Sequence, residues 1–99
     1  MIARMWMGEV RAVDLDAYTE VLDRTGRTDA LATEGNRGVL LLRRVEAERG
    51  KFVFISLWDS MAAVEAFAGA EPERARYYPE DREYLLSFPD RVEHFEVMD

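Results

Sequence analysis

The chain has 99 residues, of which 48% are hydrophobic, and it is expected to form one globular domain over residues 1–99. It contains no cysteine, which excludes disulfide bonds, thiolate metal sites and a cysteine nucleophile. The formal net charge of −7 argues against nucleic acid as a partner, because a phosphate backbone is bound by positively charged surfaces.

The first residues carry no export or membrane signal. The opening MIARMWMGEV lacks the continuous apolar core and the small-residue cleavage site of a signal peptide. No run in the sequence approaches the roughly 18 consecutive apolar residues of a membrane span. We therefore expect a cytoplasmic protein with no membrane partner.

The first predicted elements are a strand and a helix. Residues 2–10 are rich in large apolar side chains, which is typical of a strand. Asp14 is expected to cap the helix that follows, and Gly26 is expected to weaken it. Four residues at helical spacing predict its buried face: Leu15, Tyr18, Val21 and Leu22.

A turn and a β-hairpin come next. Gly35 and Gly38 bracket the predicted turn. The runs 37–47 and 51–58 then predict two strands, and the polar stretch between them supplies a hairpin loop that ends in Gly50.

A second helix is predicted directly after the hairpin. Ser60 can cap it, and Gly69 stands where a helix usually stops. Its apolar stripe has helical spacing: Met61, Val64 and Phe67.

The last quarter of the chain predicts a further helix and a strand. Pro72 suits the first turn of a short helix over residues 73–78, which Pro79 interrupts. Residues 91–98 alternate between apolar and polar side chains, as a strand with one wet face does.

The element order is therefore β-α-β-β-α-β. This order folds most simply as a ferredoxin-like α+β domain, with both helices on one face of a four-stranded antiparallel sheet. Val39–Leu42 and Phe52–Leu57 are apolar on both faces apart from Ser56, so the face without helices also needs a cover. A second copy of the chain is the economical cover, which predicts a homodimer with the sheets face to face.

Three stretches together resemble the antibiotic biosynthesis monooxygenase family: IARMW, ISLWDSMAAVEAF and RARYYPEDREYLL. The resemblance covers essentially the whole chain, and its most specific part is the strand–Trp–Asp–Ser–helix junction at Leu57–Ser60. It implies a dimeric α+β barrel made of two ferredoxin-like subunits. It also implies a small-molecule enzyme, since the family contains cofactor-free oxygenases and haem-degrading enzymes.

The haem-degrading members of that family use an Asn on the first strand, a Trp on the second helix and a His ten residues later. The Trp position matches Phe67 here, and the His position matches Tyr77. The only Asn is Asn36, in the predicted turn, and the only His is His94, on the last strand. Haem degradation is therefore not expected and no cofactor is predicted, although a tyrosine that ligates haem iron remains an alternative.

Two residues are candidates for catalysis. Tyr77 carries a phenol that can orient a hydroxylated aromatic substrate, and of Tyr77 and Tyr78 one is expected to face inward and the other outward. Arg4 places a charge in the middle of an apolar strand and must be paired. It either anchors a ligand carboxylate or enolate, or forms a structural ion pair with a nearby acid: Glu9, Glu93 or Glu96.

Four further residues are candidates for the wall of a ligand pocket: Trp58, Phe67, Tyr78 and His94. Each has a structural alternative, because Trp58 and Phe67 also suit the core and His94 also suits a structural or interfacial role. A single His without cysteines makes no convincing metal site, so no metal is predicted.

Two functional hypotheses follow. The first is a cofactor-independent monooxygenase that acts on a small phenol- or quinol-type molecule between helices and sheet. The second is a non-catalytic dimeric module that binds a small ligand or a protein partner. An open cavity between helices and sheet favours ligand binding, and a fully packed space favours the partner-binding module.

Overall fold

The fold is seen in a computed structural model in which residues 1–98 are described. The elements, in chain order, are β1 (Ile2–Arg11), α1 (Leu15–Leu22), α2 (Thr28–Ala32), β2 (Asn36–Glu46), β3 (Arg49–Trp58), α3 (Met61–Ala68) and β4 (Glu93–Glu96). Short 3-10 turns occupy Ala12–Asp14 and Pro79–Glu83, and a π-helical turn, Asp23–Arg27, joins α1 to α2. No helix within residues 1–98 is long and apolar enough to cross a bilayer.

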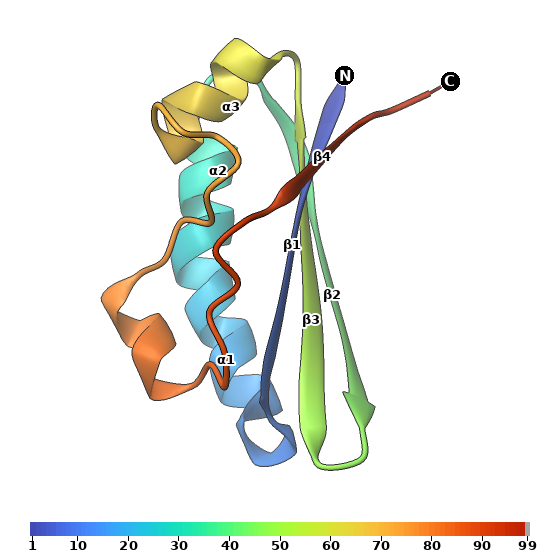
Figure 1. The fold of residues 1–99 in the computed structure, drawn as a ribbon, viewed down its shortest axis with the longest axis vertical. Helices are drawn as coiled ribbons and strands as arrows, with labels where there is room; N and C mark the ends of the chain where they lie inside the picture. The colour runs from blue at the N-terminus through green and yellow to red at the C-terminus, as the bar shows by residue number, and fades with distance from the viewer. Residues whose placement is uncertain (99) are drawn as a thin grey trace.

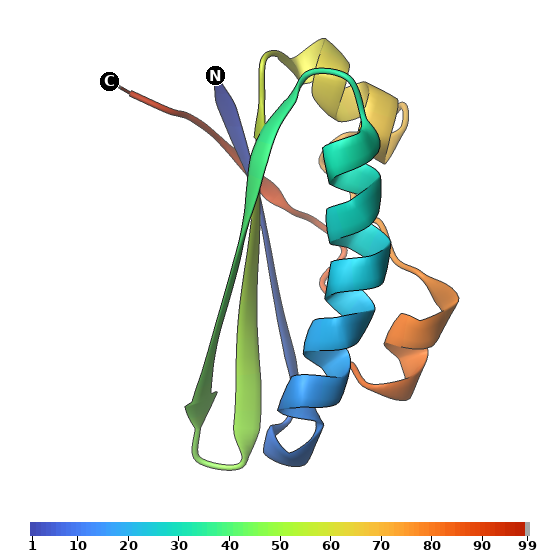
Figure 2. The same ribbon diagram turned by 180° about the vertical axis from the view of Figure 1, so that it is seen from behind.

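The four strands form one antiparallel sheet in the order β2-β3-β1-β4. β1 pairs with β3 along its whole length, from Ile2 opposite Trp58 to Arg11 opposite Arg49, whereas β4 covers only its first half. The helices and the segment that follows α3 all lie on one face of the sheet, and the other face is bare (Figures 1 and 2). The predicted ferredoxin-like fold is confirmed.

The first helical segment begins where predicted and has the predicted buried face. Tyr18, Val21 and Leu22 are buried. Asp14 occupies the N-cap position of α1 as predicted, but its carboxylate makes no capping bond and instead accepts a hydrogen bond from Arg11 Nε at 3.2 Å. Helical structure continues past Gly26 through the π-helical turn, so this glycine does not end the helix.

The second helix begins and ends as predicted. Ser60 Oγ accepts a hydrogen bond from the backbone N–H of Ala63 at 3.2 Å and caps α3. Gly69 follows the last helical residue at a φ of 95°, a left-handed conformation that glycine adopts without steric cost.

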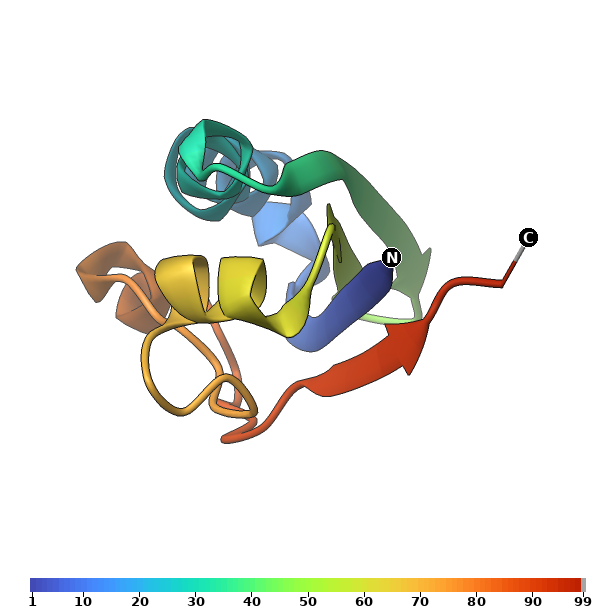
Figure 3. The same cartoon turned by 90° about the horizontal axis from the view of Figure 1, so that it is seen from above.

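The third predicted helix is wrong. Residues 73–78 are not helical but form an irregular segment that runs beside the helices (Figures 1 and 3). We call residues 73–89 the strap. The strap is fixed to the chain before β4, because Ala75 N–H bonds Asp90 O and Val92 N–H bonds Glu73 O, both at 2.8 Å. Residues 73–75 therefore make backbone hydrogen bonds to the chain before β4 and not to one another in a helix. The last strand is also shorter than predicted, at Glu93–Glu96.

The core lies between the sheet and the helices. Strand alternation directs alternate residues of β1 and β3 toward the helices, and these are buried: Trp6, Val10, Phe52, Phe54 and Trp58. The strand residues that alternate with this buried set point to the bare side, which we call the open face. Its apolar side chains include several that are about half exposed: Met7, Leu40, Leu42 and Phe95.

Candidate functional site

A narrow crevice lies where α1, the sheet and the strap meet. Its volume is about 40 Å³, and its wall combines aromatic, cationic and hydroxyl side chains. The lining residues are Arg4, Trp6, Tyr18, Leu22, Thr25, Gly26, Phe54, Phe67, Arg76, Tyr77, Tyr78 and Asp81. Four of the six candidate residues therefore come together here, from β1, α3 and the strap: Arg4, Phe67, Tyr77 and Tyr78.

Arg4 is a buried cation without a carboxylate partner. Its side chain is 4% exposed, Nη2 donates to Arg74 O at 2.9 Å, and Nε has no hydrogen-bond partner. Among residues 1–98 no ion pair contains Arg4, so the predicted pairing with an acid is wrong.

The cross-strand register explains why Arg4 has no acidic partner, because His94 stands opposite Arg4. Glu9 and Glu93 belong to the open face, and Glu96 is exposed opposite Ile2.

The surroundings of Arg4 leave it charged. Burial, and then the positive charge of Arg76, lower the pKa of Arg4 to about 10. That value is well above neutrality, so the guanidinium carries its charge at neutral pH. Its carbon lies 5.6 Å from the centre of the Phe67 ring, and the Arg76 guanidinium carbon lies 4.8 Å from the same centre. The ring is thus in cation–π contact with two arginines.

Tyr77 presents a phenol to the crevice and uses its hydroxyl twice. It accepts a hydrogen bond from Trp6 Nε1 at 3.2 Å and donates one to Pro89 O at 2.5 Å. Burial raises the pKa of Tyr77 above its ordinary value, while the bond from Trp6 opposes this, and the phenol remains a proton donor at neutral pH. Gly8 makes room for this arrangement, since a Cβ there would lie 2.2 Å from the Trp6 ring.

Tyr78 also lines the crevice, so the expectation that one of the two tyrosines faces outward is wrong. Its hydroxyl donates to Asp29 Oδ2 at 2.6 Å, and Arg76 Nη2 donates to the same oxygen at 3.2 Å. Burial and the Asp29 bond raise the pKa of Tyr78. Asp29 thereby holds two strap residues against α2 and keeps the strap closed.

Asp81 anchors the other end of the crevice. It is buried, but both carboxylate oxygens are occupied: Tyr18 Oη donates to Oδ1 at 2.9 Å and Tyr78 N–H to Oδ2 at 2.7 Å. Burial, together with the neighbouring carboxylate, raises the pKa of Tyr18. Asp81 therefore organises the strap and has no free oxygen for a ligand.

Trp58 and His94 lie outside the crevice lining. Trp58 is completely buried, donates from Nε1 to Ser56 Oγ at 2.8 Å, and packs on Phe67 with ring centroids 5.4 Å apart. It supports the crevice wall from behind.

His94 is partly buried on β4, and its Nε2 has no hydrogen-bond partner. Within residues 1–98 no cluster of His, Asp or Glu is arranged to hold a metal ion.

The lowered pKa of His94 makes the stability of the fold depend on pH. Burial and then the Arg4 charge lower the pKa of His94, against a smaller opposing effect of Glu73. Because the folded pKa lies below the ordinary value of about 6.5, the unfolded chain takes up the proton first. The contribution of neutral His94 to stability is thus fully present above about pH 6.5. It is lost as the pH falls from there toward the pKa of His94 in the folded protein.

We expect the wild type to lose more stability than His94→Gln between about pH 7.5 and pH 5, because glutamine does not titrate there. Urea unfolding at both pH values measures this, and the comparison cancels the other titrating groups. Equal losses in the two proteins would contradict the assignment.

Eight of the twelve lining residues were not identified as site residues from the sequence, among them Trp6, Tyr18, Arg76 and Asp81. Trp6 had a usable signal, since strand alternation places it on the same face as Arg4. Arg76 and Asp81 had none. Arg76 lies in the stretch 73–78 that was predicted to be helical, and Asp81 lies in the charged run 79–83, which has the composition of a solvated loop.

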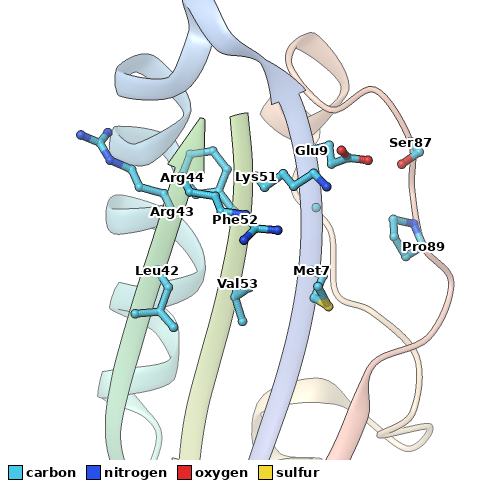
Figure 4. A pocket seen from close by; sticks show the side chains of 11 residues that line it. Met7, Glu9, Leu42, Arg43, Arg44, Lys51, Phe52, Val53, Ser87 and Pro89 are labelled. Carbon is cyan, nitrogen blue, oxygen red and sulfur yellow. The ribbon is translucent and has the colours of Figure 1, made fainter. Parts of the chain in front are cut away.

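A larger and shallower depression of about 580 Å³ lies on the open face (Figure 4). Met7, Leu42 and Val53 form its apolar floor from three neighbouring strands, while Arg44 and Lys51 bring positive charge. The residues that line it are Met7, Gly8, Glu9, Leu42, Arg43, Arg44, Lys51, Phe52, Val53, Ser87 and Pro89. It lacks the convergent phenols and buried charge of the crevice.

Comparison with known proteins concerns the fold. No family model matches the chain, and no curated protein matches it. Among solved structures, a "Putative antibiotic biosynthesis monooxygenase from Nitrosomonas europaea" superposes with a TM-score of 0.71 at 13% identity, with 100% of both chains covered. The chain has this protein's fold. Rv0793 from Mycobacterium tuberculosis superposes with a TM-score of 0.61 at 17% identity, with 100% of this chain and 97% of that chain covered.

The resemblance inferred from IARMW, ISLWDSMAAVEAF and RARYYPEDREYLL is thus confirmed at the level of the fold. At such identities a shared fold does not carry a shared activity, because one fold hosts many functions.

Proposed function

We propose that the protein is a cofactor-independent oxygenase that acts on a small, flat phenol-type molecule bound in the crevice. The observation that carries the proposal is the meeting of a buried, unpaired Arg4 and the Tyr77 hydroxyl inside aromatic walls. The likeness in fold to a structure named as a monooxygenase supports the same reaction class.

In the proposed reaction the substrate is its own reductant. A phenol with a free para C–H would react with one O2 to give the quinone and one water. One oxygen atom enters the new C=O group, and the other leaves as water with the hydrogens of the phenolic O–H and the ring C–H. Arg4 would stabilise the phenolate that donates electrons to O2. Tyr77 would turn its O–H away from Pro89 O and donate the hydrogen bond to the phenolate oxygen instead.

Binding requires the strap to move. The crevice of about 40 Å³ holds little more than one or two waters, whereas small-molecule sites typically measure roughly 300–1,000 Å³. The bonds from Arg76 and Tyr78 to Asp29 close the strap and are the ones that would open. In this proposal the substrate enters between the strap and α2, and the strap then closes and excludes water from the reacting phenolate.

Tyr77→Phe is expected to lower the rate of oxygen uptake on a panel of dihydroxylated aromatics by roughly 100-fold, because the oxyanion loses a donor. Tyr84→Phe is the matched control, since Tyr84 lies outside the crevice lining and should keep most of the activity. An oxygen electrode measures both. Equal rates in wild type and Tyr77→Phe would remove Tyr77 from the mechanism.

The small crevice also favours a second candidate function, a non-catalytic dimeric module that binds a partner. In this alternative the strap never opens and no member of the panel is bound or oxidised. Absence of both binding and oxygen uptake across the panel would favour the module over the oxygenase.

We infer that in either case the open face pairs with its own copy. Its apolar side chains come from every strand, and a two-fold axis lets one such patch cover itself. Charges of both signs stand at one end, where Glu46 pairs with Arg44 at 3.1 Å and with Lys51 at 2.9 Å. A face that carries both signs is suited to self-association, because two-fold symmetry can place opposite charges together.

A further inference from the structure

We propose that the ligand of the crevice already carries a negative charge when it binds, as an aromatic carboxylate or an acidic enol in its ionised form. This rests on the proposed function, since it assigns the substrate class of the same site. It goes further, because the oxygenase mechanism alone requires only that a charge develops during the reaction.

The first argument is the unbalanced charge of Arg4. A guanidinium that is 4% exposed is costly to hold without a counter-charge, and in proteins such groups are normally paired. The chain has 20 acidic and 13 basic residues, so the missing partner of Arg4 does not follow from a lack of acidic residues. The register nevertheless places His94 opposite Arg4, and burial and the Arg4 charge lower the pKa of His94 and favour its neutral form.

The second argument is that the acids near the crevice are already committed. Both oxygens of Asp81 accept hydrogen bonds, from Tyr18 and from the Tyr78 backbone. Asp29 is partly exposed and is shared between Tyr78 and Arg76. Among residues 1–98 neither carboxylate forms an ion pair with Arg4.

The third argument is the position of the two cations relative to a flat surface. Arg4 and Arg76 both lie within 6 Å of the centre of the Phe67 ring, at 5.6 and 4.8 Å. An aromatic ligand that packs beside Phe67 would therefore have two guanidiniums within reach of an acidic substituent. Arg4 Nε supplies a donor without a partner, suited to a carboxylate or enolate oxygen.

The experiment compares a charged ligand with a neutral one of the same shape. 1-Hydroxy-2-naphthoic acid and its primary amide are titrated into the full chain by calorimetry at neutral pH. The acid is expected to bind at least about tenfold more tightly than the amide, because a charge-assisted hydrogen bond is stronger than a neutral one. In Arg4→Met this preference should disappear, and in Arg4→Lys part of it should return.

Arg49→Met is the matched control, because Arg49 is exposed at the start of β3 and lies outside the crevice lining. It should keep the full preference for the acid. The wild-type comparison of acid and amide needs no variant, so the proposal remains testable if Arg4→Met fails to fold.

The outcomes separate this inference from the proposed function. Equal binding of acid and amide by the wild type would overturn the charge selection and leave the aromatic site in place. A preference for the acid that survives in Arg4→Met would also overturn it, because the charge would be recognised elsewhere. Binding of neither compound would contradict both the charge selection and the site itself.

Discussion

Replacing Trp58 with alanine is expected to lower the free energy of unfolding by roughly 3–5 kcal/mol, a large fraction of the roughly 5–15 kcal/mol that is typical of a domain. Trp58 is completely buried and packs on Phe67, so the substitution opens a cavity behind the crevice wall. It also leaves the buried Ser56 Oγ without the indole donor it has at 2.8 Å. Both effects act in the same direction.

Urea unfolding followed by circular dichroism measures this loss. Trp58→Phe is the graded control, because it keeps an aromatic ring in the space and removes only the hydrogen bond and part of the volume. It should lose markedly less stability than the alanine variant. Similar losses for the two variants would mean that the hydrogen bond to Ser56, and not the packing on Phe67, holds this part of the core.

Ile55→Glu is expected to convert the proposed dimer into a monomer. Ile55 lies between Met5 and Leu40 in the cross-strand register, near the middle of the open face. A carboxylate there would be enclosed between two apolar sheets without a partner, at a cost of several kcal/mol in each copy. In the monomer the same carboxylate faces water, so the fold itself should persist.

Light scattering on wild type and variant gives the masses directly. The wild type should show twice the chain mass of 11.4 kDa, and Ile55→Glu should show the single mass with an unchanged circular dichroism spectrum. Leu31→Glu is the matched control, because Leu31 is a half-exposed apolar residue on α2, on the opposite side of the sheet. A wild type that is monomeric at micromolar concentration would contradict the sheet-face pairing.

The fold could be predicted from the sequence because its strands and helices have strong periodicity. Apolar residues on both faces of β3 also indicated that neither face of the sheet is suited to solvent exposure. Ser60 and Gly69 placed the ends of α3 correctly, since a cap and a left-handed glycine act within a few residues. Such local interactions are readable without knowledge of the tertiary structure.

The strap could not be predicted, because its conformation depends on distant partners. Residues 73–78 have helical composition, but their backbone pairs with the chain before β4 and their side chains bind Asp29 on α2. The same cause explains the missed site residues Arg76 and Asp81. The unpaired state of Arg4 could not be predicted either, since this state follows from the register that sets His94 opposite Arg4.

A nuclear magnetic resonance titration with 1-hydroxy-2-naphthoic acid shows whether the crevice binds an aromatic ligand. The chain has two tryptophans, and their indole N–H signals report on different places: Trp6 lines the crevice, while Trp58 is buried behind it and bonded to Ser56. We predict a saturable shift of the Trp6 indole signal, with the backbone signals of Gly26 and Tyr78, and a much smaller change at Trp58. Shifts confined to Met7, Lys51 and Val53, with Trp6 unchanged, would place the ligand on the open face and contradict a binding site in the crevice.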